Sequence, residues 1–282
     1  MKTLEIGNLV RQVTKLDEET SGINLARLCA GEGRNLLDVL GVSTVAQAGP
    51  ALKAKSDAKD YTGLMLGDYL DITSDYGETF GNLTVRYEIV GMNHYDAFVD
   101  GEDIVYGKGN ITFFATRCVC DRMMDQTLIR QYSVSSMKNW LNGVVYNNLK
   151  TALGLGEFKR ILNIQQFNNG TYDVPDWSDD NDFNGLKDWK AAGSNYVYLP
   201  SIRELFGSHE LGRDCVDNSK QFAIMSLVPS KACMKLLNGN QIIGWTRTPS
   251  RGPSFFCVVY SYGHSGDNPY NYAYGVRPAF NL

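Results

Sequence analysis

The sequence predicts an α+β domain. Short apolar, β-branched or aromatic runs separated by Gly, Pro, Asn and Asp recur along most of the chain and are typical of strands and turns. Segments with apolar residues at helical spacing lie before and between these runs, in an order that does not repeat. A doubly wound sheet would alternate strands and helices regularly, so the pattern favours the α+β class.

The composition is that of an ordinary globular domain. The 282 residues are 43% hydrophobic and 21% charged, which is enough to bury a substantial core. The net charge of −4 gives no electrostatic reason to expect nucleic acid or an anionic membrane as a partner. No apolar run reaches the length of a membrane span, and residues 1–5 lack the apolar core of a signal peptide, so we expect synthesis in the cytoplasm without a signal peptide.

Residues 1–60 form a segment of different character, because they contain no aromatic residue. Their apolar spacing predicts two or three short helices joined by glycine turns, a break at Gly49-Pro50, and a short helix or linker over residues 51–60. A segment of this size makes little core of its own. We expect it either to attach the protein to partners or sister subunits, or to fold as a helical cap on the main domain.

The middle of the chain mixes strands and helices. The clearest helix is predicted over residues 133–155, with serines as caps at its start and Gly154 at its end. A second, short helix is predicted over residues 202–206 with Ser201 as its cap. Strands are predicted over residues 65–72, 84–92, 111–115 and 195–199.

The C-terminal stretch has an unusual composition. Strands are predicted over residues 242–246, 255–262 and 274–280, and residues 246–282 contain no Lys, Glu, Gln, Met or Trp. Tyr, Ser, Asn, Gly and Pro predominate, which is typical of antibody-like contact surfaces because Tyr supplies a large, stiff contact area with a polar tip. The alternative is a turn-rich hairpin with ordinary half-buried tyrosines.

Two motifs in this stretch carry a family resemblance. The sequences WTRTP at residues 245–249 and GVRPAFNL at residues 275–282 resemble the end of an uncharacterised domain family of gut bacteria and their phages. That family is similar to the C-type-lectin-like fold of formylglycine-generating enzymes and of the variable proteins of diversity-generating retroelements. The resemblance spans roughly residues 61–282. It implies a C-type-lectin-like ligand-binding domain there, with residues 1–60 as a helical attachment or oligomerisation segment.

The resemblance also implies a reason for the missing residue types. Adenine-directed mutagenesis of Asn codons in retroelement variable proteins yields Tyr, Ser, Asp, His and Gly, but never Lys, Glu, Gln, Met or Trp. Residues 246–274 are therefore a candidate variable region. The residues expected to contact a ligand are Arg251, Ser254, Phe256, Tyr260, Tyr262, His264, Asp267, Asn268, Tyr270, Asn271 and Tyr272.

The function that follows from this resemblance is ligand display without catalysis. We expect a receptor-binding protein of a phage or prophage that is associated with the virion. We also expect a homo-oligomer, and analogy with the family suggests a trimer. Its ligand would be a protein or a glycan on a cell surface. The alternatives are a structural component of the virion, whose tyrosine-rich tip packs on a neighbour, or an enzyme on the same fold.

Two sets of residues are candidates for metal or redox chemistry. The sequence DNDFNG at residues 180–185 fits the opening of a calcium loop through Asp180, Asp182 and Asn184, although Ala191 stands where the closing Glu would be; a solvated acidic loop is the alternative. The formylglycine-generating enzymes use two nearby cysteines, whereas Cys257 has no second cysteine after it. Inherited oxidase activity is therefore not expected, and Cys257 is predicted to pack in a strand.

Trp245 and Arg277 are predicted to be structural. An Arg before Pro in the final strand, with a Trp in an earlier strand, indicates a buried guanidinium bound by backbone carbonyls or a carboxylate and stacked on an aromatic ring.

Overall fold

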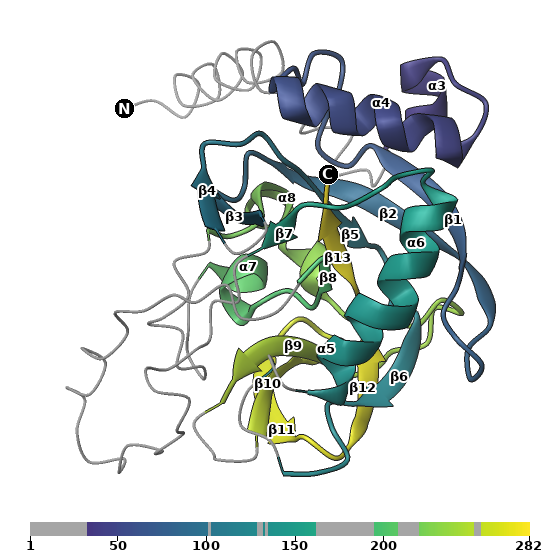
Figure 1. The fold of residues 1–282 in the computed structure, drawn as a ribbon. Helices are drawn as coiled ribbons and strands as arrows, with labels where there is room; N and C mark the ends of the chain where they lie inside the picture. The colour runs from purple at the N-terminus through teal and green to yellow at the C-terminus, as the bar shows by residue number, and fades with distance from the viewer. Residues whose placement is uncertain are drawn as a thin grey trace, which may run out of the picture.

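In the part of the chain that the structure describes, two five-stranded sheets and one three-stranded sheet form the body, with helices packed around them (Figure 1). The computed structural model describes residues 33–100, 103–128, 132, 135–161, 195–207, 220–250 and 255–282. The predicted α+β class is confirmed. The first sheet is antiparallel and contains, in spatial order, β1 (Tyr69–Asp75), β2 (Asn82–Met92), β5 (Ile111–Ala115), β13 (Ala279–Asn281) and β8 (Val197–Tyr198).

The second sheet is built mainly from the C-terminal part of the chain. Its order is β11 (Ser265–Pro269), β10 (Phe255–Val259), β9 (Gly244–Pro249), β12 (Ala273–Val276) and β6 (Cys120–Met123). All its pairs are antiparallel except β9 with β12. The small sheet contains β4 (Asp103–Tyr106), β3 (Ala97–Asp100) and β7 (Arg160–Ile161).

The strands of the first sheet agree closely with the apolar pattern. Strand β5 has the predicted bounds and is buried at every position, as expected for a central strand. Strand β1 alternates buried and exposed residues, but it begins at Tyr69 and not at residue 65. The reason is a turn before it, in which Gly67 has a φ of 83° and the Asp68 carboxylate accepts a hydrogen bond from the Met65 amide at 2.9 Å.

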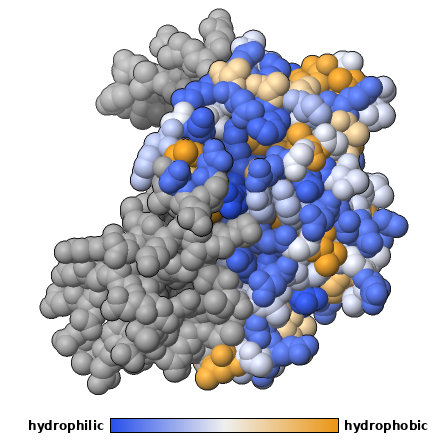
Figure 2. All heavy atoms as spheres, in the orientation of Figure 1, coloured by the Kyte–Doolittle hydropathy of each residue, from blue (hydrophilic) through white to orange (hydrophobic). Residues whose placement is uncertain are grey.

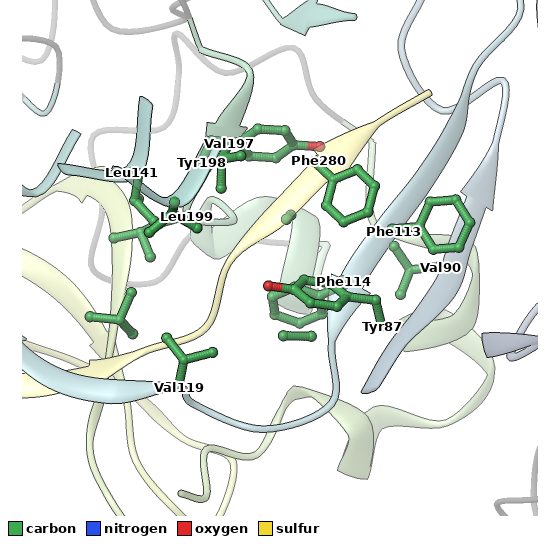
Figure 3. Packing of buried hydrophobic residues seen from close by; sticks show 14 of the residues in the cluster. Tyr87, Val90, Phe113, Phe114, Val119, Leu141, Val197, Tyr198, Leu199 and Phe280 are labelled. Atoms are coloured by element: carbon green, nitrogen blue, oxygen red, sulfur yellow. The ribbon is translucent and has the colours of Figure 1, made fainter. Parts of the chain in front are cut away.

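Phe280, next to the C-terminus, lies at the centre of the core. Its ring stacks on Phe113 with centroids 5.2 Å apart and on Phe158 at 4.8 Å, and it contacts Tyr87 at 5.2 Å. Figure 3 shows how residues from β2, β5, β8 and β13 meet here. Burying one phenylalanine side chain stabilises a fold by roughly 1.5–3 kcal/mol, so the end of the chain is a structural element of the core.

The closing segment joins the two large sheets. Residues 274–280 were predicted as one strand, but the structure contains two: β12 pairs with β9 and β6, whereas β13 pairs with β5 and β8. The break falls at Arg277-Pro278, where Pro278 has no N–H to donate to a ladder. A further difference is β11, whose sequence SGDNP reads as a turn but pairs with β10 over its whole length.

The predicted helix over residues 133–155 is three consecutive elements. They are α5 (Ser136–Trp140), a π-helical turn (Leu141–Val145) and α6 (Tyr146–Ala152). The Ser135 side chain caps the start by accepting from the Lys138 amide at 3.0 Å, and Gly154 follows the end with a φ of 63°. The π turn presents Asn142, which accepts from the Tyr196 amide at 2.6 Å and donates to the Val197 carbonyl at 2.9 Å. This bulge therefore ties the helix to β8.

The short helices further along the chain follow the sequence pattern. Helix α7 (Ile202–Phe206) has the predicted bounds, and its Ser201 cap forms a capping box with Glu204. It precedes α8 (Ala223–Leu227) and a 3₁₀ turn (Pro229–Ala232).

The described part of the N-terminal segment is a helical cap. Helix α3 (Leu36–Leu40) and α4 (Val45–Ala58) lie at the top of Figure 1, above the first sheet. Arg34 forms two side-chain hydrogen bonds with Asp68 at 2.6 and 3.0 Å, and the Ser56 hydroxyl donates to the Leu282 carbonyl at 2.5 Å. For residues 33–60 the cap alternative therefore holds, while an attachment role remains a prediction.

The predicted break at Gly49-Pro50 is wrong, because α4 runs through both residues from its Thr44 cap. Gly49 has another role at this point. A Cβ atom on Gly49 would lie 1.9 Å from the Leu153 carbonyl oxygen, and one on Gly154 would lie 2.6 Å from the Ala46 carbonyl oxygen. The two glycines thus allow the backbones of α4 and of the end of α6 to touch.

Replacing Gly49 by alanine is expected to destabilise the protein, although alanine usually improves a helix by about 1 kcal/mol. The added methyl group would force the two backbones apart, at a cost of roughly 2–3 kcal/mol and a fall in Tm of roughly 5–10 °C. The control is Gly143→Ala in the π turn, where a Cβ atom meets nothing within 4 Å. Thermal unfolding of both variants is the measurement; equal Tm values would contradict the close contact.

Apolar side chains gather in the interior. Figure 2 shows that the described part of one face is mostly hydrophilic, with apolar residues in small separate patches. Within the described ranges no helix combines the length and apolar character needed to cross a membrane.

Candidate ligand-binding site

The tyrosine-rich tip predicted from the sequence is a surface at the ends of β10, β11 and β12. Tyr262 and Tyr272 are the most exposed, at 66% and 55%. His264 and Asn271 are also exposed, whereas Tyr260, Asp267, Asn268 and Tyr270 are half-buried. Eight of the predicted contact residues are therefore accessible from solvent on one turn-rich part of the chain.

Stacked aromatic rings form the centre of this surface. Tyr260 and Tyr262 are parallel within 6° with centroids 5.4 Å apart, and His264 lies 5.3 Å from Tyr262. Tyr272 and Tyr274 form a second stack, at 6.1 Å and 12°. We call these five residues the tyrosine surface. The two stacks are neighbours. Burial raises the pKa of Tyr274, and the phenol of Tyr272 in the same stack and that of Tyr260 in the other stack raise it further.

Buried residues fix the position of each stack. Tyr274 packs edge-on against the buried Trp245 at 4.9 Å. Tyr260 lies across β11, because a Cβ atom on Gly266 would be 2.4 Å from the Tyr260 ring. Tyr260 and Tyr262 belong to one tight turn, which closes through Gly263; this glycine has a φ of 89° and donates to the Tyr260 carbonyl at 3.0 Å. The rings therefore stand on a preformed support, which lowers the entropy lost on binding.

The polar residues of the tip are partly engaged within the protein. The Ser250 hydroxyl donates a short hydrogen bond to the Asp267 carboxylate. The Asn268 side-chain amide nitrogen is buried and has no hydrogen-bond partner among the described residues. Asp267 is consequently less available to a ligand than its sequence position indicates.

Phe256 is a correction to the predicted contact list. It is fully buried and lies edge-to-face on Trp245 at 6.4 Å, so it belongs to the core. Strand β10 is buried on both faces from Phe256 to Val259, which removes the alternation that would have placed one side outward. Arg251 and Ser254 lie outside the described residues.

The expected calcium ligands Asp180, Asp182 and Asn184 also lie outside the described residues, so calcium binding stays a prediction. In the described ranges, no group of three or more His, Cys, Asp or Glu side chains is placed to hold a metal ion.

The described thiols near this sheet are buried. Burial raises the pKa of Cys118 to about 12 and also raises the pKa of Cys120. Cys257 is fully buried in β10, as predicted. These three side chains are in the environment of structural thiols, not of reactive thiolates.

Trp245 and Arg277 are structural, as predicted. The Trp245 indole donates to the Arg122 carbonyl at 2.7 Å. The Arg277 guanidinium donates to the carbonyls of Ala115 and Lys231 and lies 3.9 Å from the centre of the Phe114 ring. These contacts hold both motifs inside the protein: WTRTP in β9 and GVRPAFNL at residues 275–282.

A comparison with family models gives one match, to a family described as "Domain of unknown function (DUF6273)", over residues 121–282. The chain belongs to this family. Searches of curated proteins and of solved structures gave no match. The match includes the whole tyrosine surface and both motifs around Trp245 and Arg277.

The fold extends further towards the N-terminus than the DUF6273 match. The matched residues supply β13 and β8 of the first sheet, whereas β1, β2 and β5 precede residue 121. Phe280 packs on Phe113 and Tyr87 from those earlier strands. The DUF6273 region of this chain therefore completes its core with residues outside the match.

Sequence reasoning gave no role to one buried polar cluster of the DUF6273 region. Glu204 forms a double ion pair with Arg247, at 2.6 and 2.7 Å, and accepts from the Tyr95 hydroxyl at 2.5 Å. Burial, followed by the Glu204 charge, raises the pKa of Tyr95 well above its ordinary value. One signal was present in the sequence: Ser201 and Glu204 have the spacing of a capping box. The partner Arg247 could not be predicted, because it lies 43 residues away.

Proposed function

We propose that the protein binds a protein or glycan ligand on a cell surface through the tyrosine surface, without transforming it. The observation that carries this proposal is the pair of parallel stacks, Tyr260 on Tyr262 and Tyr272 on Tyr274, each with one exposed ring. Rigid, amphipathic rings give a large contact area with little loss of side-chain entropy. The buried Trp245 and the glycine contacts beneath the stacks support a preformed recognition surface.

The finer fold belongs to the same proposal. We place residues 61–282 in the C-type-lectin-like class, of the type found in formylglycine-generating enzymes and in retroelement variable proteins. The C-terminal strands that carry the rings and end in the core agree with such a display surface, and residues 246–274 are the segment that a retroelement would diversify. A phage or prophage receptor-binding protein, assembled as a homo-oligomer, would multiply weak contacts by avidity.

The test is binding of labelled protein to immobilised intact bacterial cells and to an array of bacterial surface glycans. The double variant Tyr262→Ala, Tyr272→Ala is expected to lose binding by roughly a hundredfold, because two exposed aromatic contacts of about 1–2 kcal/mol each disappear. Both rings are exposed, so Tm should change little.

The matched control is Tyr106→Ala, which removes a tyrosine that is 73% exposed on β4, in a different sheet. It should retain full binding. Equal loss in both variants, or unchanged binding in the double variant, would show that the tyrosine surface is not the binding site.

A further inference from the structure

A second feature of the molecule is a polar cleft of about 450 Å³, whose lining includes none of the five residues of the tyrosine surface. This volume is within the range of small-molecule sites. Strands β1 and β2, the segment after β5, the 3₁₀ turn and the Arg277 segment all contribute to its walls. Five of its side chains are cationic and one is anionic: Arg86, Arg117, Lys231, Lys235, Arg277 and Glu88.

Two of the five cations are neutralised by carboxylates. Lys231 pairs with Glu88 at 2.5 Å, and Arg86 forms two hydrogen bonds with Asp71, each of 2.8 Å. The other three have no carboxylate partner among the residues that the structure describes. The cleft therefore carries an uncompensated positive charge in a protein whose overall charge is −4.

Arg117 and Lys235 form no ion pair and their side chains form no hydrogen bond with any described residue. Arg117 Nη1 is moreover buried without a partner. A buried guanidinium nitrogen without an acceptor is unfavourable, so the position favours an acceptor supplied from outside the chain. Lys235 is exposed and free to turn towards the cleft.

Arg277 contributes a positive charge whose position is fixed by its hydrogen bonds. Its guanidinium donates to carbonyl oxygens and forms no ion pair with any described residue, and Glu88 in the same cleft acts on it only through space. Burial lowers the pKa of Arg277 to about 10, with Glu88 opposing and Arg117 adding to this effect. The group is still cationic at neutral pH, and it lines the same cleft as Arg117.

We propose that this cleft binds a small phosphorylated ligand, such as a sugar phosphate, with the phosphate held by Arg117, Lys235 and the field of Arg277. A phosphate dianion offsets two of the three uncompensated positive charges and offers the acceptor oxygens that the Arg117 fork lacks. The volume exceeds that of a phosphate group alone, and the polar walls suit a hydroxylated remainder. This site does not depend on the proposed function of the tyrosine surface.

The test is calorimetric titration of the full chain with glucose 6-phosphate, inorganic phosphate and, as neutral reference, glucose. Glucose 6-phosphate should bind at least tenfold more tightly than glucose, and its affinity should fall as salt is raised. The double variant Arg117→Gln, Lys235→Gln should weaken glucose 6-phosphate binding by roughly a hundredfold, since each charge-assisted hydrogen bond contributes about a factor of ten. Glucuronate in place of the phosphate tests whether a carboxylate is the preferred anion instead.

The control removes the same charge elsewhere: Lys53→Gln, Lys108→Gln changes two lysines that line a different hollow. It should leave the affinity unchanged. A second readout needs no variant. Cys233 lines the cleft and is partly exposed, so glucose 6-phosphate should slow its alkylation, measured on the Cys233 peptide by mass spectrometry.

Four results would overturn the proposal. Two concern the probes: neither phosphate probe binds, or glucuronate binds more tightly than glucose 6-phosphate. The other two are equal weakening of glucose 6-phosphate binding in both double variants, and alkylation of Cys233 that glucose 6-phosphate does not slow. The two proposals fail separately. The tyrosine double variant should keep its phosphate affinity, and the Arg117, Lys235 variant should keep its cell binding.

Discussion

Glu204→Gln is expected to lower the free energy of unfolding by about 3–5 kcal/mol, because it leaves the buried Arg247 charge without its counter-charge. Both side chains are at most 3% exposed, and the carboxylate is shared by Arg247, the Tyr95 hydroxyl and the Ser201 amide. The cluster joins α7 to β9 and to the segment after β2. Its loss should loosen the support of the second sheet as well as lower stability.

Denaturant unfolding of a double-mutant cycle measures this pair. Glu204→Gln combined with Arg247→Met removes both charges, so the double variant should be more stable than Glu204→Gln alone, with a coupling of about 2 kcal/mol or more. The control is Asp71→Asn, which breaks the equally bidentate Arg86–Asp71 pair at a site more than 40% exposed. That change should cost less than about 1 kcal/mol. If Glu204→Gln and Asp71→Asn lower the free energy of unfolding equally, burial does not determine how much an ion pair contributes to stability.

Elements set by local chemistry were predictable from the sequence. Strand β5 and helix α7 have the predicted bounds, because an unbroken apolar run and a Ser cap act within a few residues. The main helix was placed correctly, but its π turn was not. That turn depends on Asn142 reaching β8, which is 55 residues away along the chain.

Elements set by distant partners were not predictable. The SGDNP sequence of β11 favours a turn, and its pairing with β10 overrides that preference. Gly49 and Pro50 usually break a helix, but α4 continues because Gly49 fits against the Leu153 carbonyl. The same distinction applies to the sites. The exposed Tyr262 and Tyr272 lie in one short stretch of sequence and are predicted from it, whereas the contact role predicted for Phe256 fails because β10 is buried on both faces.

The basic cleft and the Glu204 cluster had no sequence signal of their own as sites. Arg117 and Lys235 are ordinary cations in the sequence, and only the fold places them beside Arg277. Buried ion pairs and mixed-charge clefts are formed by residues far apart along the chain, so a single sequence does not assign their partners.

The protein is expected to unfold cooperatively in alkali, between about pH 11 and 12. Burial raises the pKa of Tyr76, Tyr87, Tyr95, Tyr132 and Tyr198 above the ordinary value of 10.0. Above pH 10 the unfolded chain loses these protons while the folded protein keeps them. The stability they contribute is complete below pH 10 and is lost as the pH rises, by about 1.4 kcal/mol per pH unit for each group.

Arg277 acts in the opposite direction, because burial lowers its pKa to about 10 from 12.5. Between these values the unfolded state binds more protons than the folded state. The free energy of unfolding therefore rises by about 1.4 kcal/mol per pH unit through this one group. These six groups alone leave a net loss of roughly 5–6 kcal/mol per pH unit, which within one or two units matches the total stability of a typical domain. The buried thiols of Cys118 and Cys120, whose pKa values burial also raises, act in the same direction as the tyrosines.

Circular dichroism and tyrosinate absorbance, followed together against pH, measure this transition. The variant Tyr76→Phe, Tyr87→Phe removes two buried hydroxyls that bond each other at 2.8 Å and no other described residue, so the double replacement leaves no described partner unpaired. It should raise the unfolding midpoint by at least about half a pH unit. The control, Tyr106→Phe with Tyr262→Phe, removes two solvent-exposed hydroxyls and should leave the midpoint in place. If the two double variants unfold at the same pH, the buried phenols do not govern stability in alkali.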